Sequence, residues 1–132
     1  MKTSKLKSIF ALLLLSAVFF TACKKDKPAL DPQKEIIGNW VGTFKSYNNP
    51  VPSYFRINIK TANKMEVLSK QNEVLAVGTY TLTGDKIQAM YTYFNGGETY
   101  NFYATYTMGT KKITGTYAVD ETGLGDFSLD KQ

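Results

Sequence analysis

Few residues in this sequence could carry out covalent chemistry. There is no histidine, which removes the commonest general base and the commonest transition-metal ligand. The one cysteine, Cys23, has no second thiol or imidazole to pair with. Asp120, Glu121 and Glu98 could form a carboxylate pair, but adjacent acids in a predicted turn are more commonly solvated. We therefore expect no enzymatic activity, no cofactor and no metal site.

Cys23 follows a segment with the anatomy of a secretory signal. Lysines at positions 2, 5 and 7 precede an apolar run over residues 9–20, and small residues precede the cysteine. The run is shorter than the ~20 residues that a bilayer-spanning helix needs. Residues 20–23, Phe-Thr-Ala-Cys, resemble the lipobox of bacterial lipoproteins. The resemblance implies a signal peptide over residues 1–22 and a lipidated Cys23 that anchors the protein to a membrane. An ordinary signal peptide with an incidental cysteine, or an uncleaved anchor, remains the alternative.

Residues 23–35 are charged, contain two prolines and are expected to form a flexible tether after the lipidated cysteine. The charges directly after Cys23 resemble the export signals of lipoproteins from the Bacteroidetes group. This resemblance implies an outer-membrane lipoprotein on the periplasmic or the cell-surface face. Asp31 followed by Pro32 predicts one short helical turn that covers one mouth of the domain.

The charge balance argues against a nucleic-acid partner. The chain has 16 basic and 11 acidic side chains, and removal of the three lysines of the signal segment leaves 13 basic residues and a net charge of +2. Nucleic-acid binding usually requires a strong basic patch.

The remaining residues, 36–132, show the spacing of an all-β domain. Turn signals recur about every 12 residues, and no segment after Glu35 has sustained helical periodicity. The strands must then be antiparallel and joined by hairpins. The sequence predicts an eight-stranded antiparallel up-and-down barrel, with strands near residues 36–47, 53–60, 64–69, 74–82, 86–94, 98–108, 111–119 and 124–130.

The expected inner face of this barrel is rich in aromatic side chains. An eight-stranded barrel is either filled by its side chains or able to hold one small ligand, and both possibilities stay open here. Tyrosine hydroxyls could orient an apolar ligand. Tyr91 and Tyr93 are further candidates on a strand that alternates poorly. The candidate ligand-binding residues of the interior are Trp40, Phe44, Tyr80, Phe102, Tyr106 and Tyr117.

Gly38-Asn39-Trp40, placed after a predicted helical turn at the start of the first strand, resembles the Gly-x-Trp signature of the lipocalins. The resemblance implies a calycin-type barrel, with Trp40 packed across its closed end. No Thr-Asp-Tyr motif follows, and Lys131 stands where the family has an arginine over the tryptophan. Gly-Thr-aromatic triplets at residues 42–44, 78–80 and 115–117 also resemble those of the avidins, without a match to the biotin-binding residues.

Two functions are compatible with such a domain. The first is binding of a small apolar or amphipathic ligand in the interior of a membrane-anchored lipoprotein. The alternative is a protein-interaction module, such as an inhibitor of lysozymes or proteases, that acts through loops such as residues 48–52.

In an up-and-down order, the connections fall at two ends of the barrel. Tight connections at one end carry lysines, which we expect to face the membrane unless they serve solubility alone. Looser connections at the other end carry acids. Arg56, the only arginine, is expected to point outward, because Phe55 and Ile57 occupy the inward positions of its strand. The lysines are Lys60, Lys64, Lys86, Lys111 and Lys112, and the acids are Glu73, Glu98, Asp120 and Glu121.

Overall fold

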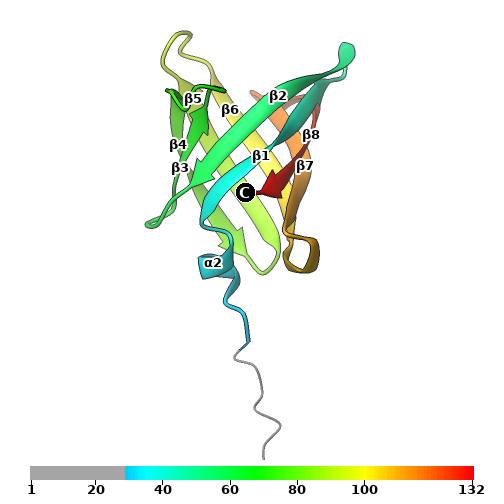
Figure 1. Cartoon of the computed structure of the whole chain (residues 1–132). Helices are drawn as coiled ribbons and strands as arrows, with labels where there is room; N and C mark the ends of the chain where they lie inside the picture. Colours follow the sequence, from blue (N-terminus) through cyan, green and yellow to red (C-terminus); the bar gives the residue numbers. More distant parts are fainter. Residues whose placement is uncertain (1–28) are drawn as a thin grey trace, which may run out of the picture.

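Residues 29–132, the part of the chain described by a computed structural model, form a closed barrel of eight antiparallel strands in up-and-down order (Figure 1). This confirms the predicted fold class. Each strand pairs with its neighbour in sequence, and β8 pairs with β1 to close the barrel. The strands are β1 (Gly38–Ser46), β2 (Asn49–Ile59), β3 (Lys64–Leu68), β4 (Val74–Thr83), β5 (Lys86–Tyr93), β6 (Thr99–Thr107), β7 (Lys112–Val119) and β8 (Thr122–Lys131).

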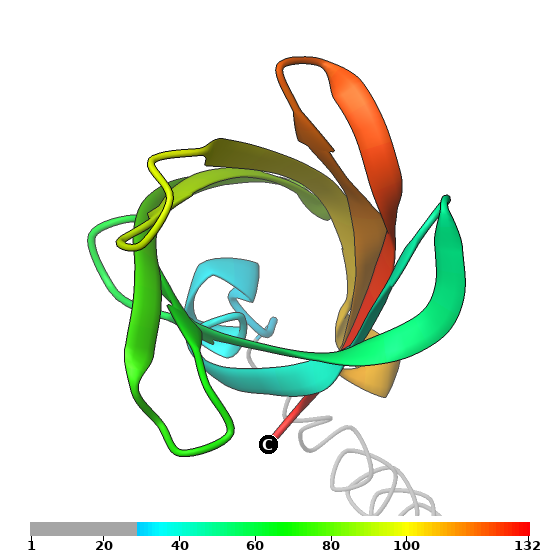
Figure 2. The same cartoon turned by 90° about the horizontal axis from the view of Figure 1, so that it is seen from above.

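Two short helices lie at one end of the barrel, which we call the closed end. The α2 helix (Pro32–Glu35) begins at the Asp31 cap, whose carboxylate accepts from the Gln33 backbone N–H, and this confirms the predicted turn. The Gln33 side chain donates to the Leu82 carbonyl at 3.1 Å and ties α2 to β4. Seen along the barrel axis, α2 lies across the far opening (Figure 2). A 3-10 helix, η2 (Met108–Thr110), joins β6 to β7. Cys23 and the first part of the predicted tether, residues 23–28, lie outside the described residues.

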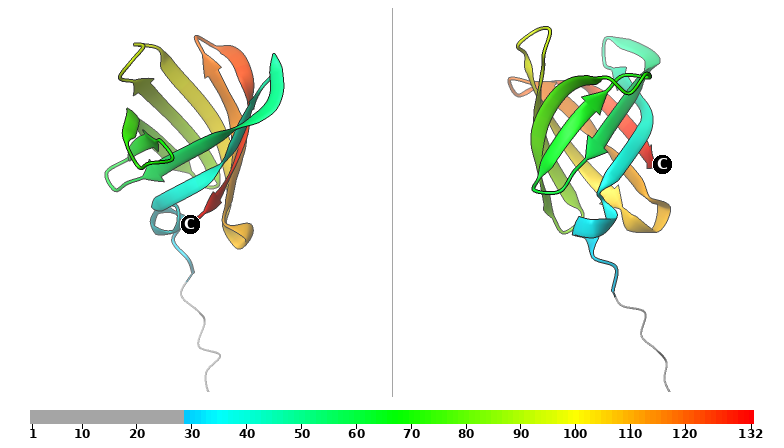
Figure 3. Two further views of the ribbon diagram at one scale, coloured as in Figure 1. Left: turned by 45° about the horizontal axis from the view of Figure 1, so that its top comes forward. Right: turned by 60° about the vertical axis from the view of Figure 1, so that its left-hand side comes forward.

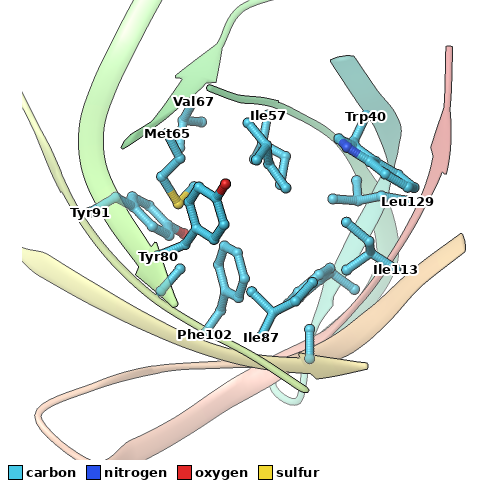
Figure 4. Packing of buried hydrophobic residues seen from close by; sticks show 14 of the residues in the cluster. Trp40, Ile57, Met65, Val67, Tyr80, Ile87, Tyr91, Phe102, Ile113 and Leu129 are labelled. Atoms are coloured by element: carbon cyan, nitrogen blue, oxygen red, sulfur yellow. The ribbon is translucent and has the colours of Figure 1, made fainter. Parts of the chain in front are cut away.

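The closed half of the barrel is filled by apolar side chains. Alternation along each strand directs every second residue inward, and these residues meet near the axis (Figure 4). Several are at most 1% exposed: Trp40, Ile57, Ile59, Met65, Ile87, Ile113 and Leu129. Burial of this set is the main stabilising contribution to the fold, at about 25 cal/mol per Å² of apolar surface.

Inward-facing glycines bring neighbouring strands unusually close together. A Cβ built on Gly78 would lie 2.0 Å from the Met90 carbonyl oxygen, and one on Gly115 would lie 2.2 Å from that of Tyr103. Gly42 and Gly125 show the same clash with the backbones of β8 and β1. Each of these four glycines also pairs with an aromatic residue on an adjacent strand: Gly42 with Phe55, Gly78 with Tyr91, Gly115 with Phe127, and Gly125 with Tyr117. Glycine therefore permits the strong coiling of the sheet, and the facing ring covers the space that it leaves.

The opposite end of the barrel, which we call the open end, is wider. The register shifts between Phe44 and Ser46, between Val67 and Leu68, and between Tyr117 and Ala118, all close to this end. Irregularities of this kind bend strands and increase their twist, and the strands diverge toward the open end (Figure 3).

Strand β2 starts at Asn49, four residues before the predicted start, and carries two prolines. The register pairs only Ile57–Ile59 of β2 with Met65–Val67 of β3, so Pro50 and Pro52 lie where β2 has no ladder with β3. Proline lacks a backbone donor and is tolerated at such an edge. The hairpin formed by β1 and β2 therefore projects at the open end as two extended strands rather than as a long loop (Figure 1).

The predicted difference in turn length between the two ends is wrong in detail. At the open end, the hairpins joining β1 to β2 and β7 to β8 have two-residue turns, Tyr47-Asn48 and Asp120-Glu121. Asp120 and Glu121 both have positive φ, at 46° and 66°, which suits a tight hairpin turn. At the closed end, the two-residue turn Gly84-Asp85 joins β4 to β5, whereas the connections from β2 to β3 and from β6 to β7 are longer.

Candidate ligand-binding cavity

A cavity of 320 Å³ occupies the open half of the barrel. Six of its eight lining residues are aromatic, and none carries a formal charge. This volume lies at the lower end of the range of about 300–1,000 Å³ that is typical of small-molecule sites. The lining residues are Phe44, Ser46, Phe55, Tyr91, Tyr93, Tyr100, Tyr117 and Leu124.

Six strands supply the lining through regular alternation. On β5, Tyr91 and Tyr93 are two residues apart and face the same side. Tyr91 pairs directly with Tyr100 of β6, so one register position contributes two rings to the wall. Phe44 and Ser46 are the last inward positions of β1.

The floor of the cavity consists of packed aromatic rings. The Phe102 and Phe127 ring centroids lie 5.2 Å apart, and those of Phe55 and Phe127 lie 5.7 Å apart, both edge to face. Phe102 is fully buried. Because this layer separates the cavity from the closed half, a ligand would enter from the open end.

The tyrosines of the wall contact one another. Tyr91 and Tyr100 are stacked, with an interplanar angle of 10° and centroids 5.5 Å apart. Tyr93 meets both rings edge to face, at 5.7 and 5.5 Å. On the opposite side, the Phe44 and Tyr117 rings lie 5.6 Å apart. The cavity thus presents both ring faces and ring edges to a ligand.

The wall hydroxyls are held in their neutral form. Burial raises the pKa of Tyr91 far above its ordinary value, and the adjacent tyrosines add to the shift. Burial also raises the pKa of Tyr93, and that of Tyr100, where a hydrogen bond to Glu98 contributes further. The pKa of Tyr117 is raised by burial, although a hydrogen bond from Ser46 opposes the shift. At neutral pH the wall therefore offers phenol groups that can both donate and accept hydrogen bonds.

Two of the six predicted interior residues, Phe44 and Tyr117, line the cavity. The other four are buried in the barrel interior and are not among the lining residues, although Phe102 belongs to the ring layer beneath the cavity: Trp40, Tyr80, Phe102 and Tyr106. Tyr91 and Tyr93, considered as additions, do line it. Sequence reasoning did not select Ser46, Phe55, Tyr100 or Leu124 as site residues. The signal that could have found them is position along the strand: lining residues are the inward positions nearest the open end.

Trp40 closes the other end of the barrel. Its indole Nε1 donates to the Ile36 carbonyl at 2.8 Å, and its ring meets the edge of Tyr106 at a centroid distance of 5.5 Å. The Lys131 ammonium group lies 5.7 Å from the Trp40 ring centroid and donates to the Glu35 carbonyl. Lys131 thus covers the tryptophan as predicted. Among the described residues, the buried hydroxyl of Tyr106 has no hydrogen-bond partner.

Arg56 points outward, as predicted, and is no partner for a ligand in the cavity. Its guanidinium donates to the side-chain oxygen of Asn72 and, at 3.3 Å, to that of Asn39. Asn72 belongs to the connection between β3 and β4. Arg56 therefore links the β3–β4 connection to β2 at a point where β2 and β3 are not joined by backbone hydrogen bonds.

The acidic residues considered as a carboxylate pair lie in the connections at the open end of the barrel. Asp120 and Glu121 are exposed in a hairpin turn, and Glu98 accepts a hydrogen bond from the Tyr100 hydroxyl at 2.9 Å. Within residues 29–132, no group of three or more cysteine, aspartate or glutamate residues could hold a metal ion.

Residues 29–132 also contain no helix that is long and apolar enough to span a membrane. Comparisons of the chain with protein-family models, with curated proteins and with solved structures give no match.

Proposed function

We propose that this protein is a non-enzymatic, membrane-anchored lipoprotein whose lipocalin-like barrel binds one small apolar or amphipathic molecule in the open-end cavity. The observation that carries the proposal is the 320 Å³ cavity, with six aromatic rings in its lining and a packed aromatic floor. Each Å² of apolar ligand surface removed from water contributes about 25 cal/mol to binding. The phenol hydroxyls and Ser46 would orient a polar group of the ligand.

The end of the barrel at which the chain enters supports one orientation of the barrel relative to the membrane. The chain enters the barrel through α2 at the closed end, so a tether from Cys23 reaches the end opposite the cavity mouth (Figure 1). The mouth would then face away from the membrane and be accessible to ligands in solution. This orientation applies on either the periplasmic or the cell-surface face of the outer membrane.

The lysines of the closed end contribute less to attachment than their number suggests. Lys60 pairs with Glu66, Lys86 with Asp85, and Lys112 with Asp130. These carboxylates offset the attraction of the lysines for an anionic surface. Attachment therefore rests on the acyl chains, each buried CH₂ of which contributes about 0.8 kcal/mol.

Metabolic labelling with palmitate tests the anchor. We expect the wild-type chain to incorporate label and to fractionate with membranes, and the Cys23→Ala variant to lose both properties. A Cys23→Ala variant that remains labelled would contradict the lipoprotein assignment.

Native mass spectrometry of the untagged protein extracted from its own cells tests ligand binding. A retained small-molecule mass that disappears on denaturation is the expected result. A bare protein mass would count against the ligand-binding function.

A protein-interaction module remains the second candidate, because large apolar side chains are exposed at the open end. Tyr47, Val51 and Phe94 are 60%, 65% and 63% exposed. They lie in the connections and strand ends around the cavity mouth, where a partner such as a lysozyme or a protease could dock. Under this alternative, the Phe94→Ser variant would lose partner inhibition while the cavity lining stays intact.

A further inference from the structure

The rings that line the cavity form a partial aromatic cage. Tyr91 and Tyr100 stack parallel to each other, Tyr93 stands at right angles to them, and Phe44 and Tyr117 form the facing wall. The faces of such rings carry negative electrostatic potential and attract cations, with methylated ammonium groups as the best-known ligands. Binding of an apolar ligand depends only on burial of its surface among the rings. Binding of a cation also depends on ring faces that are directed toward its charge.

Carboxylates surround the mouth of this cage. Glu98 accepts a hydrogen bond from the Tyr100 hydroxyl at 2.9 Å, so one negative charge directly contacts a lining residue. Asp126 lies beside Lys45 on the outer face of the paired strands β1 and β8, accepts from the Tyr47 hydroxyl at 3.1 Å and raises the pKa of Tyr117 through its charge. Three more acids lie in the open-end connections: Glu73, Asp120 and Glu121.

The lysines at the open end lie on the outer surface of the barrel. Lys45 follows the inward Phe44 on β1 and is exposed. The Lys70 ammonium group lies 5.4 Å from the centroid of Tyr54, which alternates outward beside the inward Phe55. Neither side chain lines the cavity. A ligand at the mouth therefore meets the Glu98 carboxylate and the π-faces inside, and no residue of the cavity lining carries a positive charge that could balance a negative ligand.

We propose that the cavity selects small organic cations, in particular molecules with a methylated ammonium group, over neutral molecules of the same shape and over carboxylates. This inference rests on the proposed ligand-binding function. It specifies the ligand as an amphipathic cation whose charged group lies among the rings and whose neighbouring polar group reaches the hydroxyls of the wall.

Three molecules of nearly the same shape and different charge test the selectivity. Choline is the cation, 3,3-dimethylbutan-1-ol is its neutral carbon isostere, and 3,3-dimethylbutanoate is an anion of similar size. The full chain is reconstituted in nanodiscs of digalactosyldiacylglycerol, a lipid whose headgroup has neither an ammonium group nor a net charge. Binding is measured by isothermal titration calorimetry, with empty nanodiscs subtracted. We expect choline to bind at least about fivefold more tightly than the neutral isostere, and the anion to bind most weakly.

Two pairs of variants localise the effect. Glu98→Gln keeps a hydrogen-bond acceptor for Tyr100 and removes the charge, so it should weaken choline binding about threefold and leave the alcohol unchanged. Asp85→Asn removes a comparable exposed charge at the closed end and should change neither. Tyr93→Leu should weaken choline more than the alcohol, whereas Tyr93→Phe, which retains the ring, should bind choline like wild type.

The outcomes separate this inference from the function on which it rests. Equal or tighter binding of the alcohol, or tightest binding of the anion, would overturn cation selectivity and leave ligand binding in place. Failure of all three molecules to bind would also overturn it. The retained mass in native spectrometry then decides the ligand-binding function independently.

Discussion

Replacement of Gly78 by alanine should destabilise the barrel strongly, although the added group is a single methyl. The new Cβ would lie 2.0 Å from the Met90 carbonyl oxygen and 2.7 Å from the Tyr91 Cα. Both contacts are with backbone, so no side-chain rotation relieves them, and β4 and β5 must separate locally by about 1.4 Å to reach ordinary contact distance. Overpacking of this kind costs about 1–3 kcal/mol, and the loss of two ladder hydrogen bonds adds about 1 kcal/mol each. We therefore expect the free energy of unfolding to fall by about 3–5 kcal/mol.

Urea unfolding followed by tryptophan fluorescence measures this loss. Trp40 is the only tryptophan and is fully buried, so its emission reports on the intact closed end. Gly96→Ala is the matched control, because a Cβ at that position meets no atom within 4 Å. The control should change stability by less than about 0.5 kcal/mol. If Gly78→Ala came within about 1 kcal/mol of Gly96→Ala, the role assigned to the inward glycines would be refuted.

Three further predictions concern other parts of the barrel. Trp40→Ala should cost about 3–5 kcal/mol of stability in urea unfolding followed by circular dichroism, since it leaves a cavity at the closed end and removes the hydrogen bond to Ile36. An unchanged urea midpoint would contradict the role of Trp40 in closing this end of the barrel. Because the pKa of Tyr91 is higher in the folded state than in the unfolded chain, its contribution to stability is complete below about pH 10 and is lost as the pH rises further. Tyr91→Phe should therefore flatten the alkaline decline by up to about 1.4 kcal/mol per pH unit, measured by unfolding at pH 9 to 11, and an identical slope would disprove the assignment. Arg56→Ala should speed hydrogen exchange in β3 and its connection to β4, because it releases Asn72; unchanged exchange there would show that this link is dispensable.

The barrel could be predicted because its determinants are local. On β6, Phe102, Ala104 and Tyr106 alternate with polar residues and are buried, so the inward face could be read from sequence alone. The Asp31 cap and the Gly84-Asp85 turn depend on neighbouring residues only. With every connection short, the up-and-down order followed from the hairpins.

The cavity could not be located in the same way, because its position depends on pairing between strands. Trp40 and Phe44 occupy the same inward face of β1, yet Trp40 closes one end and Phe44 lines the cavity at the other. The difference comes from irregular register near the open end, such as the shift between Tyr117 and Ala118, which has no clear sequence signal. The ring that packs beside Gly78 is likewise not the aromatic residue of its own triplet, Tyr80, but Tyr91 on the next strand.

Native mass spectrometry of a cavity-filling variant tests the central claim most directly. Leu124 lines the cavity and is half-buried, so Leu124→Trp should place an indole within the cavity, whereas Val77→Trp adds the same group to an exposed position on the outer face of β4. With both variants extracted from their own cells, we predict that the Val77→Trp protein retains the small-molecule mass found on the wild-type protein and that the Leu124→Trp protein lacks it. Retention of the same mass by the Leu124→Trp protein would contradict binding in the open-end cavity.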